Sequence, residues 1–343
     1  MSSELLPPRA ANRLAWMGWR LYDPRVRALL YQFVLAAAVG LAAWYVVANT
    51  AENLQARGIA SGFHFLFREA GFEISETTFL SYSAASTYLR ALAVGVFNTL
   101  RVAALAIVLA TLLGALIGLA RLSRNWLVAR SAAAYVEVIR NVPLLVQLFF
   151  WYALITEYFP APAAALNPLP GIFISNRGIV FPLPRSDLAL EYPELAGFNF
   201  TGGGALSPEF AALLLGLVIY TASFIAEIVR AGILAVDSGQ FEAAQAAGLS
   251  PWQTMHFVIL PQALRAIVPP LTSQYLNIAK NSSLAVAIGY PDLVSVANTI
   301  INQTGQAIEG IAIIMLVYLT ISLALSAFMN WYNRRIALKG GSP

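Results

Sequence analysis

The sequence has no cysteine and only two histidines, His64 and His256, among its 343 residues. Without thiolates it has no disulfide framework and no zinc or iron–sulfur site built on cysteine, and two histidines argue against a histidine-built metal centre. Charged residues are also scarce, at 11%, against about 25% in soluble domains. These shortages exclude a soluble globular enzyme and a disordered chain.

Apolar residues take the place of the missing charges. Hydrophobic residues make up 59% of the chain, and the mean hydropathy is +0.68. A helix needs about 20 apolar residues to cross a bilayer core of roughly 30 Å. Runs of that length predict six crossings, over residues 28–48, 91–120, 131–155, 209–229, 270–288 and 310–331. We therefore expect an all-α, polytopic membrane protein with about six transmembrane helices.

The placement of Lys and Arg predicts the orientation, because cytoplasmic loops are enriched in both. With the N-terminus inside, 13 basic residues fall on inner segments, five on the two longer outer loops and three within spans. The net charge of +4 thus comes from residues that flank apolar runs, which does not indicate a nucleic-acid-binding face. Both termini are expected in the cytoplasm, and residues 158–208 are expected to form a folded but irregular outer cap.

Polar side chains recur at helical spacing inside four of the spans, where an ionisable group costs about 2.5–3.5 kcal/mol to insert. Glu137 and Arg140 in the third span and Glu227 and Arg230 in the fourth belong to these stripes. Two interpretations stay open: hydrogen bonds and ion pairs that hold a bundle together, or the lining of a polar pathway. The candidate pathway residues are Asn98, Arg101, Gln147, Tyr220, Ser223, Asn277 and Lys280.

Two further patterns predict local geometry. Gly114 and Gly118 are four residues apart in the second span and predict a close helix–helix contact. Between the fourth and fifth spans, residues 240–247 are rich in helix formers, Gly248 suits the left-handed end of a helix, and Ser250 with Pro251 begins a second helix. This second helix is expected to stop at Pro261. Such an elbow is either a docking element for a partner or a plain surface hairpin.

The elbow resembles the EAA signature of bacterial ABC importer permeases. The matching residues are Glu242, Ala243, Ala244, Gly248, Leu260 and Pro261, with Val258 where the signature has Ile. Residues 138–147, 220–230 and 280–284 resemble polar amino-acid permeases of the histidine/glutamine type. Residues 22–27, 60–63 and 175–178, with the two long outer loops, resemble the Q-type membrane subunit of general L-amino-acid transporters.

The resemblance implies a type I ABC importer permease fold in the bacterial inner membrane. Residues 1–90 would hold the N-tail, the first helix and the first outer loop, and 336–343 the C-tail. The permease core would be 91–335, with an outer insertion at 158–208 and a cytoplasmic coupling loop at 230–262. In that loop the six matching residues would couple transport to the ATPase.

The implied partners are a second, M-type permease subunit, an ABC ATPase dimer and a periplasmic binding protein that delivers an amino acid. Neither of the two lysines, Lys280 and Lys339, follows a glycine, so the chain has no Gly-x-x-x-x-Gly-Lys phosphate loop. ATP and Mg²⁺ are therefore expected on the partner ATPase, and this chain is expected to hold no cofactor and not to be an enzyme. The alternatives are an ion-coupled secondary transporter, which predicts an inverted repeat, and a membrane receptor or scaffold.

Overall fold

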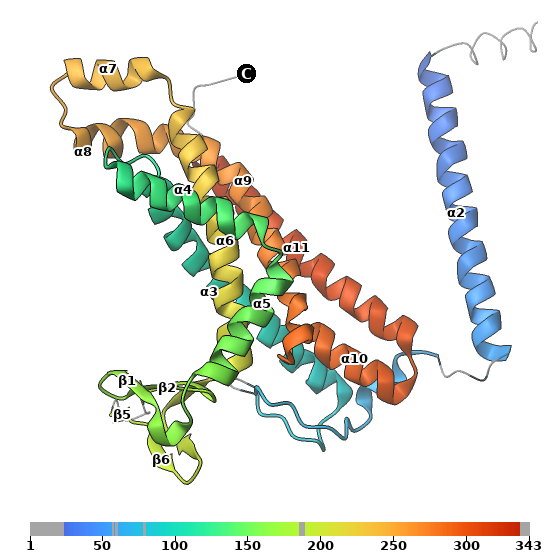
Figure 1. Ribbon diagram of the computed structural model, residues 1–343. Coiled ribbons are helices and arrows are strands. Elements are labelled where there is room, and N and C mark those ends of the chain that lie inside the picture. The colour runs from blue at the N-terminus through green and yellow to red at the C-terminus, as the bar shows by residue number, and fades with distance from the viewer. Residues whose placement is uncertain (1–23, 57, 59–60, 78–79, 185–188, 337–343) are drawn as a thin grey trace, which may run out of the picture. The chain divides into compact units, whose positions relative to one another are not determined.

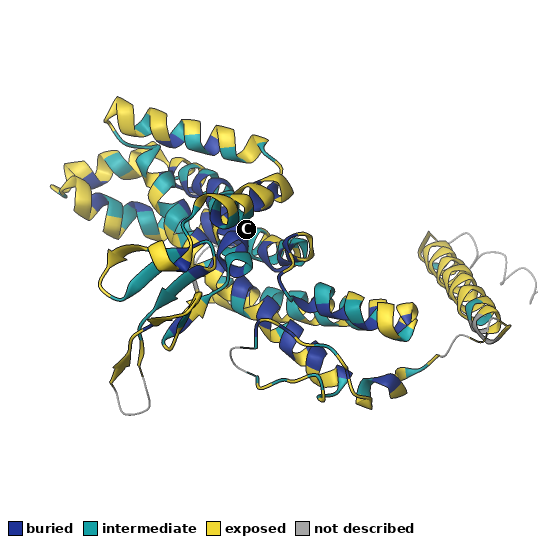
Figure 2. Cartoon of the chain, turned by 60° about the horizontal axis from the view of Figure 1, so that its bottom comes forward, coloured by how far each residue is buried: buried dark blue, intermediate teal, exposed yellow. Residues whose placement is uncertain are grey.

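The computed structural model describes residues 24–336 except 57, 59–60, 78–79 and 185–188, and it divides into two compact units, 1–61 and 62–343. The predicted N-tail up to residue 23, most of the C-tail and Lys339 lie outside the described residues. The first unit contributes α2 (Pro24–Ala56), which contains the predicted span 28–48. Its apolar side chains, such as Trp44, are exposed along its length, as expected of a helix that crosses lipid (Figure 2).

The second unit is built on four long helices, α3 (Tyr88–Ala120), α6 (Pro208–Leu234), α9 (Leu260–Asn281) and α11 (Ala307–Ile336). The shorter helices are α4 (Trp126–Asn141), α5 (Leu144–Ala153), α7 (Ser238–Ala246), α8 (Pro251–Gln253) and α10 (Leu293–Thr304). Short 3₁₀-helices lie at η1 (Phe63–Phe67), η3 (Pro162–Ala164) and η5 (Ser282–Ile288), and short π-helices lie at η2 (Leu154–Tyr158) and η4 (Thr254–Ile259).

The main core joins buried aliphatic residues of α3, α5, α6 and α9, and a second cluster joins residues 65–94 to α10. Helices α3 and α6 pack closely at two glycines. A Cβ added at Gly114 would lie 2.6 Å from the Ile225 Cβ, and one at Gly118 would lie 2.7 Å from the Ala226 carbonyl oxygen. The predicted glycine contact is confirmed, because any side chain at these positions would separate the two helices.

Four described helices are long and apolar enough to cross a membrane, and two bent helix pairs raise the number to as many as six. The first pair corrects the straight span predicted over 131–155, because α4 and α5 meet at 102°. Pro143 cannot donate to a continuous helix, and Val142 before it adopts extended backbone, with φ −97° and ψ 125°. Glu137 and Arg140 on α4 therefore do not form one stripe with Gln147 on α5.

The second bent pair corrects two further expectations. Helix α8, η4 and α9 follow one another without a break, so the predicted stop at Pro261 and the predicted start at residue 270 are both wrong. In η4 the N–H of Leu260 bonds to the Met255 carbonyl, five residues back, so the regular α-helical hydrogen bonds are already interrupted at this point. The helix can therefore continue through Pro261, which has no N–H to donate. After η5 the chain bends by 53° into α10, which the sequence did not predict.

The segment 158–208 is folded, as predicted, but its description as irregular is wrong. Four antiparallel strands form a sheet in the order β1 (Leu166–Leu169), β2 (Ile172–Ser175), β3 (Gly178–Phe181) and β8 (Gly204–Leu206). Two hairpins join β4 (Leu183–Pro184) to β5 (Leu190–Glu191) and β6 (Glu194–Ala196) to β7 (Asn199–Thr201). Strands β2 and β3 are rich in Ile, Val and Phe, and a two-residue turn joins them. Both features favour a β-hairpin.

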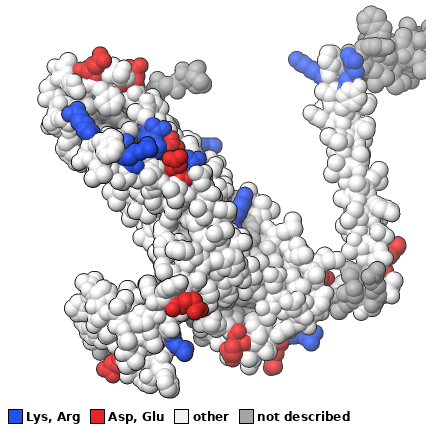
Figure 3. All heavy atoms as spheres, viewed as in Figure 1, with Lys and Arg blue, Asp and Glu red and all other residues white. Residues whose placement is uncertain are grey.

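In the second unit, this sheet and α7 lie at opposite ends of α6, whose 27 residues span about 40 Å (Figure 1). On the face shown, charged side chains gather towards the two ends of the unit, with a largely uncharged belt between them (Figure 3). The belt matches the surface that a bilayer would cover, and the charges match the two aqueous faces.

Candidate functional site

The elbow after α6 begins with a helix that ends in a Schellman motif. The N–H of Gly248 bonds to the Gln245 carbonyl at 2.9 Å, and the N–H of Leu249 to the Ala244 carbonyl at 3.1 Å. Gly248 has φ +78°, the left-handed conformation that this motif requires and that glycine adopts without cost. The predicted role of Gly248 in the turn is confirmed.

The second arm of the elbow starts at Ser250, also as predicted. The Ser250 hydroxyl accepts from the Gln253 N–H at 3.4 Å, and the Gln253 side chain accepts from the Ser250 N–H at 2.9 Å, which together make a capping box. The Gln262 amide donates to the Gln240 side-chain oxygen at 3.1 Å and ties the two arms together. The elbow is thus a defined shape held by its own hydrogen bonds.

The predicted coupling residues divide between the inside and the outside of this elbow. Glu242, Ala243, Gly248 and Pro261 are exposed, Leu260 is half-buried and Ala244 is buried. The indole of Trp252, which is 72% exposed, stacks on His256 at 5.5 Å between ring centroids. The exposed face carries small side chains, one carboxylate and one indole, and an exposed indole is of a residue type enriched where another protein covers a surface. Docking by these residues stays a prediction.

A buried polar cluster surrounds Arg101 at the end of the unit that carries the sheet. The Arg101 guanidinium pairs with the Glu76 carboxylate at 3.2 Å and lies 4.2 Å from the centre of the Phe210 ring. Its side chain is 11% exposed and that of Glu76 is 8% exposed. Asn98 beside it donates to the carbonyls of Glu76 and Pro291 at 3.0 and 2.9 Å. Both predicted pathway residues therefore bond to groups of their own chain.

The segment 62–87 brings Glu76 to this cluster. Its Gly62 N–H donates to the Glu309 carboxylate on α11 at 2.7 Å, and the Tyr82 hydroxyl donates to the Phe72 carbonyl at 2.9 Å. Burial, with a smaller contribution from Glu73, raises the pKa of Tyr82, so this donor stays protonated. The sequence pattern gave no signal for the contact between Glu76 and Arg101, because the two residues lie in different elements and share no periodicity.

Three more predicted pathway residues serve the packing of the bundle. The Gln147 amide donates to the carbonyls of Ile139 and Val142, both at 3.0 Å, and so supplies donors at the break, where Pro143 has no N–H. Ser223 is fully buried and donates to the Tyr220 carbonyl at 2.6 Å. Tyr220 is half-buried and packs against the main core.

Asn277 and Lys280 differ from the other candidates because both are exposed on α9. They are three residues apart, so they lie on one face of the helix, and Ser273 extends that face by another turn. A polar, exposed face on a helix of a bent membrane pair has no partner among the described residues of this chain. Such a face is expected to border water or another polar surface, because lipid would leave it unsatisfied.

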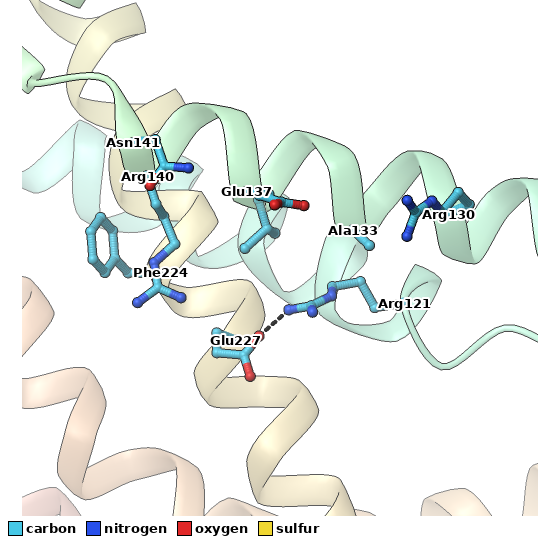
Figure 4. Close-up of a pocket in the computed structure, with 9 residues that line it drawn as sticks. Arg121, Arg130, Ala133, Glu137, Arg140, Asn141, Phe224 and Glu227 are labelled. Carbon is cyan, nitrogen blue, oxygen red and sulfur yellow. Dashed lines mark hydrogen bonds and ion pairs between the residues drawn. The ribbon is translucent and has the colours of Figure 1, made fainter.

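A charged cleft lies between α4, α6 and the end of α3, with a volume of about 600 Å³. The Glu227 carboxylate on α6 pairs with Arg121, the residue after α3 (Figure 4), and with Arg230 one turn further along α6. The interpretation of these charges as ion pairs between helices therefore holds for the pair with Arg121. Arg130, Glu137 and Arg140 line the cleft from α4. The sequence marked Glu137 and Arg140 as part of a stripe but gave no reason to expect Arg121 and Arg130 beside them.

Among the described residues, no group of three or more His, Asp or Glu side chains is placed to hold a metal ion.

Comparison with known proteins gives consistent matches. The family model for the binding-protein-dependent transport system inner membrane component matches residues 110–338. The chain is 42% identical to the general L-amino acid transport system permease protein AapQ of Rhizobium johnstonii, with 94% of this chain and 96% of that protein covered. It is 46% identical to the putative amino-acid ABC transporter permease protein YhdX of Escherichia coli, with 92% and 95% covered.

Solved structures match the helical core. The crystal structure of an amino acid ABC transporter with histidines aligns with a TM-score of 0.55 and 29% identity, over 72% of this chain and 95% of that chain. An inward-facing structure of the MetNI methionine ABC transporter aligns with a TM-score of 0.54 over 73% of this chain, at 18% identity, which supports the fold alone.

Proposed function

This chain belongs to the family of binding-protein-dependent transport system inner membrane components, as a permease subunit of an amino-acid ABC importer, and from that premise we propose how its parts serve transport. The α7–α8 elbow docks on a separate ATPase. ATP and Mg²⁺ bind there and not on this chain, which has no phosphate loop. The coupling residues are Glu242, Ala243, Ala244, Gly248, Leu260 and Pro261.

The observation that carries this proposal is the self-contained shape of the elbow. Its Schellman motif and its capping box satisfy the backbone groups that a helix end leaves free, so the elbow keeps its shape when it is pushed from outside. Phe241 packs against the main core of the unit. A displacement of α7 is therefore passed to α6 and α9, the helices that flank the elbow.

The substrate path lies against the exposed polar face of α9. Asn277 and Lys280 are the candidates that the geometry favours, because both stay exposed while Asn98 and Gln147 are buried and bonded to backbone carbonyls. A second permease subunit, of the M type, would supply the opposite wall. Arg101, Tyr220 and Ser223 would instead hold the helices in position, through the ion pair with Glu76, the packing of Tyr220 on the main core and the hydrogen bond from Ser223 to the Tyr220 carbonyl.

The proposal also assigns the other parts of the chain to the two sides of the membrane. The core is 91–335, both termini are cytoplasmic, and the membrane is the bacterial inner membrane. The sheet within 158–208 then faces the periplasm, where a binding protein delivers the amino acid. Names of similar proteins support amino acids as the cargo: AapQ is described as a general L-amino acid permease, and GltJ of Escherichia coli, 31% identical over 74% of this chain, as a glutamate/aspartate import permease.

Purification in mild detergent tests the coupling site. A tagged chain is extracted, and the proteins that accompany it in stoichiometric amounts are identified by mass spectrometry. The expected result is a subunit with a phosphate loop that is lost when Glu242→Lys is combined with Gly248→Trp. The control is Glu194→Lys, which reverses the charge of another exposed carboxylate, on the β6–β7 hairpin, and it retains the subunit. A chain that purifies alone, and then moves amino acids in ATP-free vesicles, would contradict the proposal.

A further inference from the structure

The charged cleft presents one face of α4 to α6. Arg130, Glu137 and Arg140 come from that face, Phe224 and Glu227 from α6, and Arg121 from the residue that follows α3 (Figure 4). A volume of about 600 Å³ is within the range of small-molecule sites. None of the pathway residues predicted from the sequence lines it.

The charged side chains that line the cleft differ in whether they have an ion-pair or hydrogen-bond partner among the described residues. The Glu227 carboxylate is shared between Arg121 and Arg230. Glu137, in contrast, makes no hydrogen bond or ion pair within the described part of the chain, and its side chain is exposed to the cleft. The Arg140 guanidinium lies 4.7 Å from the centre of the Phe224 ring, which holds it in place, and no carboxylate of the described residues pairs with its N–H groups.

Glu137 and Arg140 are three residues apart on one helix, so they are neighbours separated by about 4.5 Å along the axis. An acceptor and a donor of opposite charge that line one cleft from neighbouring turns of one helix complement the ammonium and the carboxylate that an α-amino acid carries on its α carbon. A guanidinium can donate two parallel hydrogen bonds to a carboxylate, which adds geometric specificity as well as binding energy.

We propose that this cleft binds a free α-amino acid, with its carboxylate on Arg140 and its ammonium on Glu137. Three arginines against two glutamates give the lining a positive excess, so acidic and neutral amino acids bind better than basic ones. The inference rests on the proposed function, since it gives the importer an amino-acid site on the side of the membrane that α7 faces. It assigns to α4 a role that the resemblance did not assign.

The test uses the purified transporter complex in nanodiscs, without ATP and without binding protein. Equilibrium binding of radiolabelled L-glutamine is measured directly. Unlabelled L-glutamate competes, and L-arginine competes less well. Glutaramic acid, which lacks the ammonium, and 4-aminobutanamide, which lacks the carboxylate, each compete at least about tenfold more weakly than L-glutamine, because each gives up one charge-assisted contact.

Variants locate the site. Arg140→Gln and Glu137→Gln each weaken L-glutamine binding about tenfold. Arg124→Gln and Glu194→Gln are the matched controls: both side chains are exposed, neither lines the cleft, and both variants bind as the unmodified complex does. A size-exclusion profile and melting temperature equal to those of the unmodified complex show that the variants are folded.

Several outcomes would overturn the inference. They are absence of L-glutamine binding, unchanged binding by Arg140→Gln, or equal competition by glutaramic acid or inorganic phosphate, which would assign the cleft to anions such as lipid headgroups. Uptake driven by ATP and binding protein is measured on the same preparations. If uptake is normal while binding fails these tests, the importer function stands and only the cleft assignment is wrong. If uptake needs no ATP, the proposed function itself is wrong.

Discussion

Replacing Gly248 by alanine perturbs the elbow in a way that the structure makes simple to interpret. The residue has φ +78°, and a Cβ added to it meets no heavy atom within 4 Å. The substitution therefore creates no clash, and its cost is the backbone strain of an L-residue in the left-handed region, about 1–2 kcal/mol. Asparagine tolerates this conformation better and valine worse, so the elbow should weaken in the order Gly, Asn, Ala, Val.

Gly305 provides a matched control at the other end of the unit. It ends α10 with φ +73°, and a Cβ there also meets no heavy atom within 4 Å. Gly248→Ala and Gly305→Ala should therefore lower the melting temperature of the complex by similar amounts. Only the Gly248 series should lower ATP-driven amino-acid uptake per assembled complex, because a loss of 1–2 kcal/mol reduces the population of the folded elbow roughly 5–30-fold relative to its open forms.

The assay is uptake of a labelled amino acid into proteoliposomes, divided by the amount of ATPase subunit that co-purifies. Unchanged uptake by Gly248→Val in a fully assembled complex would refute the reasoning, because the shape of the elbow would then not matter. An equal loss of uptake in Gly305→Ala would refute it as well, since the effect would follow general stability and not the coupling site.

Three further changes test the packing around these sites. Gly118→Leu overpacks the α3–α6 contact and should destabilise the complex by about 1–3 kcal/mol, measured as a lower melting temperature, whereas Leu116→Ala on the exposed face of α3 should not. Glu76→Gln removes the charge opposite Arg101 and should cost about 1–3 kcal/mol; simple additivity with Arg101→Leu in a double-mutant cycle would contradict the ion pair. Ser250→Ala removes a helix cap worth about 1 kcal/mol, so amide exchange in α8 should accelerate, whereas Ser250→Asp should preserve protection.

The sequence predicted best where the determinants are local. The Schellman turn at Gly248 and the cap at Ser250 each depend on a single residue type with a strong conformational preference, and both are confirmed. The contact at Gly114 and Gly118 was predictable for a similar reason, because small residues one turn apart are the usual means by which membrane helices approach closely. Spans were predictable because hydropathy depends on length and composition alone.

The sequence predicted the structure wrongly where backbone geometry or tertiary packing outweighed a local sequence rule. Hydropathy carries no information about the direction of the chain, so the apolar run through Pro143 predicted one straight span. The residue before a proline avoids the helical region, and the helix therefore breaks at Val142. The opposite error occurred at Pro261, where a preceding π-turn had already removed the hydrogen bond that proline cannot make. The sequence could not predict the ion pair between Glu76 and Arg101, because tertiary packing brings these two residues of different elements together.

ATP dependence of transport tests the central claim most directly. The co-purified complex is placed in proteoliposomes with ATP inside and amino-acid-loaded binding protein outside, and accumulation of the amino acid is followed with and without ATP, and with ionophores that collapse ion gradients. A permease subunit coupled through the α7–α8 elbow to a separate ATPase predicts accumulation that requires ATP and survives the ionophores. Accumulation that proceeds without ATP and disappears with the ionophores would contradict the account.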